Sequence, residues 1–92
     1  MITVHVTGFL TGFTGGQRDI TLGGRPPTVG EALESLWKAH PGLRDRVVNE
    51  LGHVRPHVNV FVNQDNIRQR EALGTPLAAG DDITILPAIS GG

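Results

Sequence analysis

The sequence contains no cysteine and no tyrosine, and its aromatic residues are three phenylalanines and one tryptophan. Without cysteine there is no disulfide framework, no thiolate nucleophile and no four-cysteine iron–sulfur cluster. No run approaches 18 apolar residues, and the N-terminus lacks a basic region followed by an apolar stretch. We therefore expect a cytoplasmic protein that neither spans nor binds a membrane.

The chain also has no excess of positive or negative charge. Eight basic residues stand against nine acidic ones, for a formal net charge of −1, and the basic residues are scattered along the chain. This balance does not support binding to nucleic acid. His53 and His57 have the spacing of helical metal ligands, but Pro56 lies between them and no thiol or carboxylate completes a site, so we expect no metal.

A chain of 92 residues makes one domain, residues 1–92, that is too small for a roomy internal active site. Alternation of apolar and polar residues predicts its strands, because successive side chains in a strand point to opposite faces. The alternating apolar positions are Ile2, Val4 and Val6, then Ile20 and Leu22, then Val58, Val60 and Val62, and finally Ile83 and Ile85. The first two segments, joined by a glycine-rich loop, should form a hairpin.

A helix is predicted to start at Thr28, because Glu31 follows three residues later in the pattern of a capping box. An apolar stripe at spacings of three and four continues until residues 40–42, where His-Pro-Gly should end the helix. Its members are Val29, Ala32, Leu33, Leu36 and Trp37. Residues 43–56 should form a short helix or turn before an exposed loop, and residues 67–77 a short strand and a turn of helix.

The order of hairpin, helix and further strands predicts an α+β fold, in which a mixed sheet of four to five strands packs on one main helix. Pro87 should end the last strand, since proline cannot donate to a ladder. If that strand lies beside the first one, residues 87–92 form a flexible tail that could reach about 20 Å from the sheet.

The sequence ends in two glycines. Gly91 and Gly92 have no Cβ, so they can thread a narrow cleft and leave a sterically bare carboxylate. Small residues are also common at frayed domain ends, and the dipeptide by itself allows that interpretation.

Three segments in the C-terminal third, taken together, are more specific than the glycine pair. They read VNVFVN over residues 58–63, LAAGDD over residues 77–82 and ILPAISGG over residues 85–92. In this order and spacing they resemble the MoaD/ThiS family of ubiquitin-like sulfur carriers, and the similarity extends over the whole chain. The resemblance implies the β-grasp fold, and Pro87-Ala88 looks most like the cysteine-synthesis branch. Ser90 stands where the family usually has a smaller residue such as alanine.

The resemblance implies a protein cosubstrate, not an enzyme. An ATP-dependent, ubiquitin-activating-type adenylyltransferase would activate Gly92, and a sulfur donor would convert it to a thiocarboxylate. The sulfur would then pass to a cysteine synthase or to the large subunit of molybdopterin synthase. No cofactor is expected on the chain itself, ATP being used by the partner, and we expect a monomer.

Other functions remain open. The chain could be the small subunit of molybdopterin synthase, or a ubiquitin-like modifier that is conjugated through Gly92 to lysines of target proteins. A third class is an interaction domain whose tail has no chemistry.

Partner binding must then come from the folded body and from the residues at the start of the tail. We expect Phe61 to point away from the core, because Val60 and Val62 point into it, and Leu86 to do the same on the last strand. With Pro87 and Ile89 these residues form the predicted partner-binding site, next to the reacting Gly91 and Gly92. The alternative is that Phe61 and Leu86 are ordinary surface residues.

Overall fold

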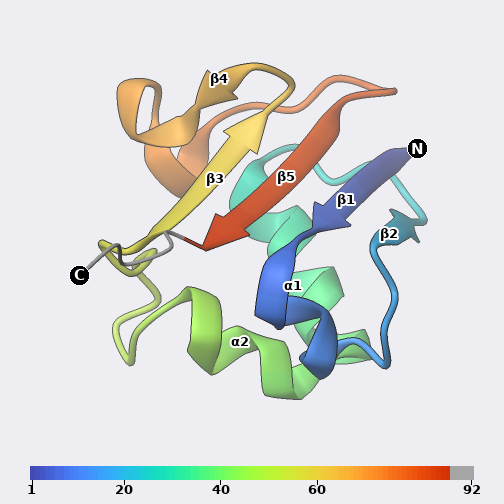
Figure 1. Ribbon diagram of the computed structural model, residues 1–92. Coiled ribbons are helices and arrows are strands. Elements are labelled where there is room, and N and C mark those ends of the chain that lie inside the picture. Colours follow the sequence, from blue (N-terminus) through green and yellow to red (C-terminus); the bar gives the residue numbers. More distant parts are fainter. Residues whose placement is uncertain (88–92) are drawn as a thin grey trace.

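Five strands form one mixed sheet in the computed structural model, which describes residues 1–87 (Figure 1). The strands are β1 (Ile2–Val6), β2 (Asp19–Leu22), β3 (Val58–Val62), β4 (Asp65–Asn66) and β5 (Asp82–Pro87). Their order across the sheet is β2-β1-β5-β3-β4. The first and last strands, β1 and β5, pair in parallel, and the other neighbours are antiparallel. The predicted hairpin of β1 and β2 is confirmed, and the last strand lies beside the first, in the middle of the sheet.

Helices cover one face of this sheet (Figure 1). They are α1 (Val29–Ala39) and α2 (Pro41–Val47), with three short 3-10 helices, η1 (Gly8–Phe13), η2 (Ile67–Gln69) and η3 (Ala72–Gly74). The hydroxyl of Thr28 accepts a hydrogen bond from the backbone N–H of Glu31, as the capping pattern predicts. All five predicted stripe residues of α1 are buried. The fold is therefore the β-grasp arrangement expected from the sequence.

The core lies between the sheet and α1, and the alternation in each strand decides which side chains enter it. In β3, Val58, Val60 and Val62 are at most 4% exposed, while Asn59 and Phe61 are half-buried on the other face. Ile83 and Ile85 are fully buried in β5. Within residues 1–87, no helix covers the outer face of the sheet, and the alternate side chains lie on it.

Three local features differ from the sequence-based expectation. Pro41 ends α1 and also opens α2, because a proline is well suited to the first turn of a helix. The strand expected from Ile67 onward is instead the two-residue β4, and Ile67 is buried at the start of η2. The side chain of Asn66 accepts a hydrogen bond from the N–H of Arg68 and so favours a turn there.

The third difference concerns the tail. Pro87 is the last residue of β5, as predicted, but it is buried and pairs with Val58, so it belongs to the sheet and not to the tail that was expected over residues 87–92. Its burial follows from the period of the strand, because Ile83, Ile85 and Pro87 share the core side. Ile89, Gly91 and Gly92 lie outside the described residues.

Candidate functional site

The end of β5 is anchored on both sides, and the predicted reactive terminus follows it in the sequence. On one side, Pro87 is in register with Val58 of β3. On the other side, the hydroxyl of Thr7 donates a hydrogen bond of 3.0 Å to the carbonyl oxygen of Ile85. The segment that leads to Gly91 and Gly92 therefore starts from the middle of a packed sheet.

Gly8 contacts this same point. Its φ of +63° is a left-handed conformation that favours glycine, and an added Cβ would lie 3.3 Å from Cγ of Pro87. The turn after β1 thus packs directly against the last residue of β5. Two independent reasons, the backbone angle and the close approach, favour glycine at position 8.

Two of the predicted partner-binding residues lie together on the outer face of the sheet. Leu86 is 43% exposed and is in register with Asn59, while Phe61 is in register with Thr84. Phe61 and Leu86 are therefore diagonal neighbours on adjacent strands, which is within reach for large side chains. Of the other two predicted residues, Pro87 is turned into the core and Ile89 lies outside the described part of the chain.

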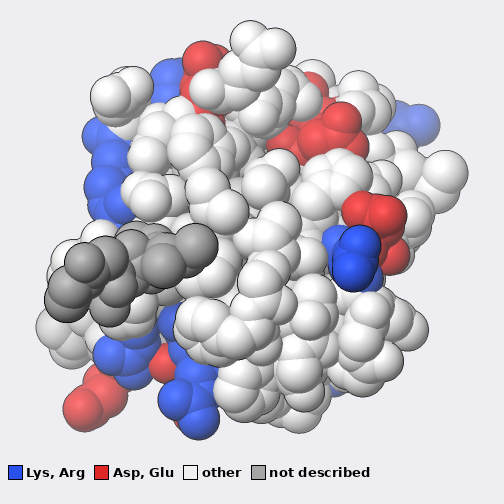
Figure 2. All heavy atoms as spheres, in the orientation of Figure 1, with Lys and Arg blue, Asp and Glu red and all other residues white. Residues whose placement is uncertain are grey.

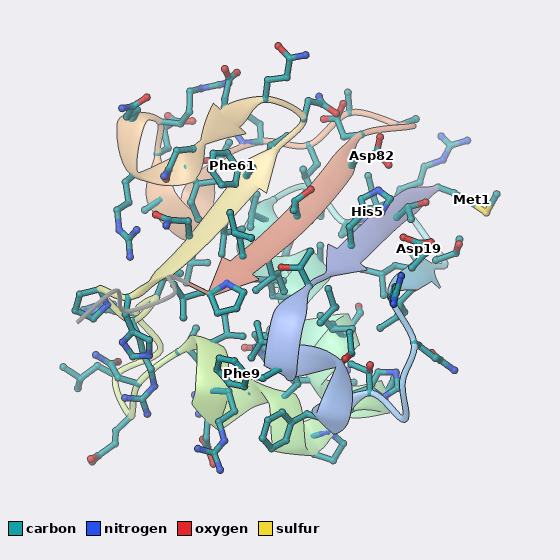
Figure 3. All side chains as sticks on the ribbon, in the orientation of Figure 1. Met1, His5, Phe9, Asp19, Phe61 and Asp82 are labelled. Atoms are coloured by element: carbon teal, nitrogen blue, oxygen red, sulfur yellow. The ribbon has the colours of Figure 1, made fainter. Side chains whose placement is uncertain are left out.

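Phe9 is an exposed aromatic residue that the sequence analysis did not identify. It lies in η1 and is 62% exposed, whereas its neighbour Leu10 is fully buried. Figure 3 shows Phe61 and Phe9 on opposite sides of the end of β5. The sequence did indicate that one of the two residues is exposed, because Phe9 and Leu10 directly follow Gly8 and adjacent side chains at such a turn cannot both enter the core.

A second cluster that was missed connects three strands on the outer face. Nδ1 of His5 lies 2.7 Å from Oδ1 of Asp19, and Nε2 lies 3.1 Å from Oδ1 of Asp82 (Figure 3). Hydrogen bonds to Asp19 and then to Asp82 raise the pKa of His5 above its ordinary value, because both carboxylates favour the imidazolium. With both ring nitrogens engaged, His5 connects β2, β1 and β5 and has no nitrogen left to act as a base.

The adjacent carboxylates Asp81 and Asp82 have separate partners. Asp81 accepts hydrogen bonds from the N–H of Ala78 and from the side-chain amide of Asn63, and these bonds lower the pKa of Asp81. Asp82 contacts His5 instead. The pair therefore lacks the shared geometry of an acid and base couple.

Within residues 1–87, no group of three or more histidine, cysteine, aspartate and glutamate side chains is arranged to bind a metal ion. None of the helices in that range is long and apolar enough to cross a membrane. The described candidate site consists of the end of β5, the outer sheet face and Phe9.

Comparison with known proteins decides the family. The sequence model of the ThiS family matches residues 4–92. The chain belongs to the ThiS family. The sulfur carrier protein CysO of Mycobacterium tuberculosis is 33% identical over 99% of this chain and 98% of the relative. The small archaeal modifier protein 1 of Haloferax volcanii is 43% identical over 71% of this chain and 70% of its own length.

Solved structures agree with this assignment. The CysO of the Amycolatopsis orientalis BexX/CysO complex has a TM-score of 0.89 and 33% identity, with full coverage of both chains. The crystal structure of SAMP1 from Haloferax volcanii has a TM-score of 0.85 and 34% identity, covering 99% of this chain and 98% of the other. As a ThiS family member, the chain has the ubiquitin-like β-grasp fold and is similar both to sulfur carriers and to protein modifiers.

Proposed function

We propose that this ThiS family member is a sulfur carrier whose Gly92 is activated by an ATP-dependent adenylyltransferase and converted to a thiocarboxylate. The observation that supports this most is the combination of family membership with the glycine pair that follows β5 in the sequence. β5 occupies the middle of the sheet and is anchored by Thr7 and Val58, so it can present a terminus without moving the body.

The chemistry follows from the carboxylate itself. A terminal carboxylate has a reference pKa of about 3.3–3.7, is ionised at neutral pH and is a poor electrophile. Attack of this carboxylate on the α-phosphorus of ATP releases pyrophosphate and gives an acyl-adenylate. Sulfide displaces AMP and leaves a thiocarboxylate on Gly92 directly. A persulfide donor first gives an acyl disulfide, and a thiol then cleaves its S–S bond, releasing the thiocarboxylate and forming a disulfide with the donor. ATP belongs to the partner enzyme, and the carrier is a cosubstrate.

Cysteine synthesis is the preferred destination of the sulfur. The relatives named CysO align over nearly the full length of this chain, and one structurally similar CysO was solved in a complex with the BexX protein. A sulfur-accepting enzyme is therefore the second proposed partner, with a cysteine synthase preferred over the large subunit of molybdopterin synthase. The carrier acts as a monomer between these transient complexes.

A second function has its own support. Relatives named small archaeal modifier proteins are 43% and 37% identical to this chain over 65 residues. In that role the same acyl-adenylate would react with a lysine amine of a target protein instead of a sulfur donor. Both functions require an activated Gly92, so they differ only in which molecule reacts with the acyl-adenylate.

Intact-mass measurement distinguishes these functions. The chain is incubated with the adenylyltransferase of the same organism, ATP and sulfide. Replacement of a carboxyl oxygen by sulfur adds about 16 mass units, and alkylation distinguishes it from oxidation of Met1, which also adds about 16. High-mass adducts with target proteins would favour the modifier function, and an unchanged mass with no adduct would contradict both.

A further inference from the structure

Three arginines near the end of β5 contact neutral groups. The guanidinium of Arg68 donates hydrogen bonds of 2.7 Å to Oδ1 of Asn59 and to the carbonyl oxygen of Arg55. Nε of Arg55 donates one of 2.8 Å to the carbonyl oxygen of Asp45. The guanidinium carbon of Arg46 lies 4.8 Å from the ring centroid of Phe13.

These contacts position the arginines without neutralising their charge. Within residues 1–87, the arginine–carboxylate pairs closer than 4.0 Å are Arg70–Asp65 and Arg44–Asp45. Arg46, Arg55 and Arg68 are absent from those pairs. A carbonyl oxygen or an aromatic ring orients a guanidinium but leaves its full positive charge available to a second molecule.

The three arginines form one continuous surface with Phe9. A shallow pocket of about 280 Å³ is lined by Phe9, Asp45, Arg46, Arg55 and His57. Arg68 extends this surface, since it contacts Arg55 and lies over Asn59, the residue in register with Leu86. We call Phe9, Arg46, Arg55 and Arg68 the arginine corner.

The outer face of the sheet and the surface beside it have groups of opposite charge near the two ends of β5, with Arg18 beside His5 and Asp45 beside Arg46 and Arg55 as exceptions. The acidic cluster of Asp19 and Asp82 lies around His5, near the beginning of β5, while the arginine corner lies near its end. Figure 2 shows basic side chains along the left margin and lower edge of this view and also on its right-hand side, and acidic ones mainly towards the top and right, with some at the lower left. A partner that binds this face would meet opposite charges at its two ends, which would fix its orientation.

We infer that the arginine corner is a docking surface for the activating enzyme, and that the enzyme presents carboxylates to Arg55 and Arg68 and an apolar socket to Phe9. The inference rests on the proposed function, which it deepens by naming the chemistry of the partner. Planar guanidinium groups match carboxylates in a two-point geometry, and an aromatic residue beside them is a typical interface anchor. Docking here places the end of β5 at the centre of the contact.

Charge complementarity favours a protein over a nucleic acid. A phosphate backbone long enough to extend from the arginine corner to the other end of β5 would meet the carboxylates of Asp19 and Asp82. A protein surface can place carboxylates opposite the arginines and basic groups opposite Asp19 and Asp82. The partner is thus an acidic protein patch of limited size.

The test compares two double variants with the same change in charge. R55Q/R68Q removes two charges of the arginine corner, and the control R25Q/K38Q removes two exposed charges from the loop before α1 and from α1 itself. For each variant, kcat/KM for pyrophosphate release is measured with the adenylyltransferase at about 0.05 M and 0.5 M salt. We expect R55Q/R68Q to lower kcat/KM about 10-fold at low salt, with the difference shrinking at high salt. The control should behave like the wild type.

Each other outcome has a definite meaning. If R55Q/R68Q matches the control, the docking surface is overturned while the proposed function stands. A wild-type chain that is not adenylated overturns the proposed function, and the docking inference with it. If R55Q/R68Q does not fold, the inference is tested by the salt dependence of the wild-type chain. A wild-type kcat/KM that does not change with salt would overturn it. Inhibition by a short RNA that R55Q/R68Q abolishes would assign the surface to nucleic acid instead.

Discussion

Gly8 and Pro87 pack so closely that a Cβ on Gly8 would lie 3.3 Å from Cγ of Pro87. The two residues are almost the full length of the chain apart, and their contact connects the turn after β1 to the last residue of β5. Together with the hydrogen bond from Thr7 to Ile85, it fixes the point from which the predicted reactive segment begins.

The first prediction concerns this contact. Gly8→Ala should lower the free energy of unfolding by about 2–3 kcal/mol, because it places a Cβ in a left-handed conformation and against Pro87. Gly15→Ala is the matched control, since Gly15 has a φ of +66° but no heavy atom within 4 Å of an added Cβ. The control should lose about 1–2 kcal/mol in urea unfolding. Equal losses would show that the contact with Pro87 contributes nothing.

The second prediction is a pH dependence. The pKa of His5 is raised in the folded state by Asp19 and Asp82, so its stabilising contribution is fully present below the unfolded value of about 6.5. The contribution is lost as the pH rises through the folded pKa. Since the side chain of His5 is 36% exposed, the effect should stay below about 1 kcal/mol.

Urea unfolding at about pH 5.5 and pH 8.5 measures this effect. The wild type should be more stable at the lower pH than His5→Gln, and the two should converge at the higher pH. The exposed His57 provides the control variant His57→Gln, which should keep the pH dependence of the wild type. If the difference in stability between the two pH values is as large in His5→Gln as in the wild type, groups other than His5 cause it.

The third prediction tests the outer face. Phe61→Asp should weaken binding to the adenylyltransferase without unfolding the domain, because Phe61 is half-buried on the face opposite the core. Ser35→Asp adds the same charge at an exposed position of α1, on the opposite side of the sheet, and should bind like the wild type. Binding is measured by calorimetry. Unchanged affinity in Phe61→Asp would remove Phe61 from the partner-binding site.

The fourth prediction separates the terminus from the body. Deletion of Gly91 and Gly92 should abolish the mass increase of about 16 units on incubation with the adenylyltransferase, ATP and sulfide. It should leave thermal unfolding unchanged, because the anchors of β5 end at Pro87. Replacement of Ser90 by alanine is a conservative control that should still be activated. A deletion variant that still gains sulfur would refute the role of Gly92.

Much of the fold could be predicted because its signals are local. The capping pair Thr28 and Glu31 and the stripe of α1 depend on residues within one or two turns of a helix. The alternation in β3 and β5 reports which face of each strand is buried, whatever its neighbours are. The place of β5 beside β1 was only a condition in the sequence argument, because strand pairing is not a local signal, and the sheet order shows that the condition is met.

The candidate site was predictable only in part. Phe61 and Leu86 could be assigned to the outer face from strand alternation, and the structure places them there as diagonal neighbours. Pro87 was also expected at the site, but the same alternation turns it towards the core. Phe9 was missed because its exposure depends on how η1 packs over α2 and β5.

Local residue patterns specify the helix α1, the strand faces and the glycine ending, because each depends on the chemistry of neighbouring residues. The tertiary structure alone decided which distant side chains meet. His5 contacts Asp82 across 77 residues of sequence, and Arg68 contacts Arg55 across 13. Such contacts arise from sheet order and register, which place β1 beside β5 and η2 beside β3. No periodicity along the chain encodes those neighbours, so the His5 cluster and the arginine corner became visible only in the folded molecule.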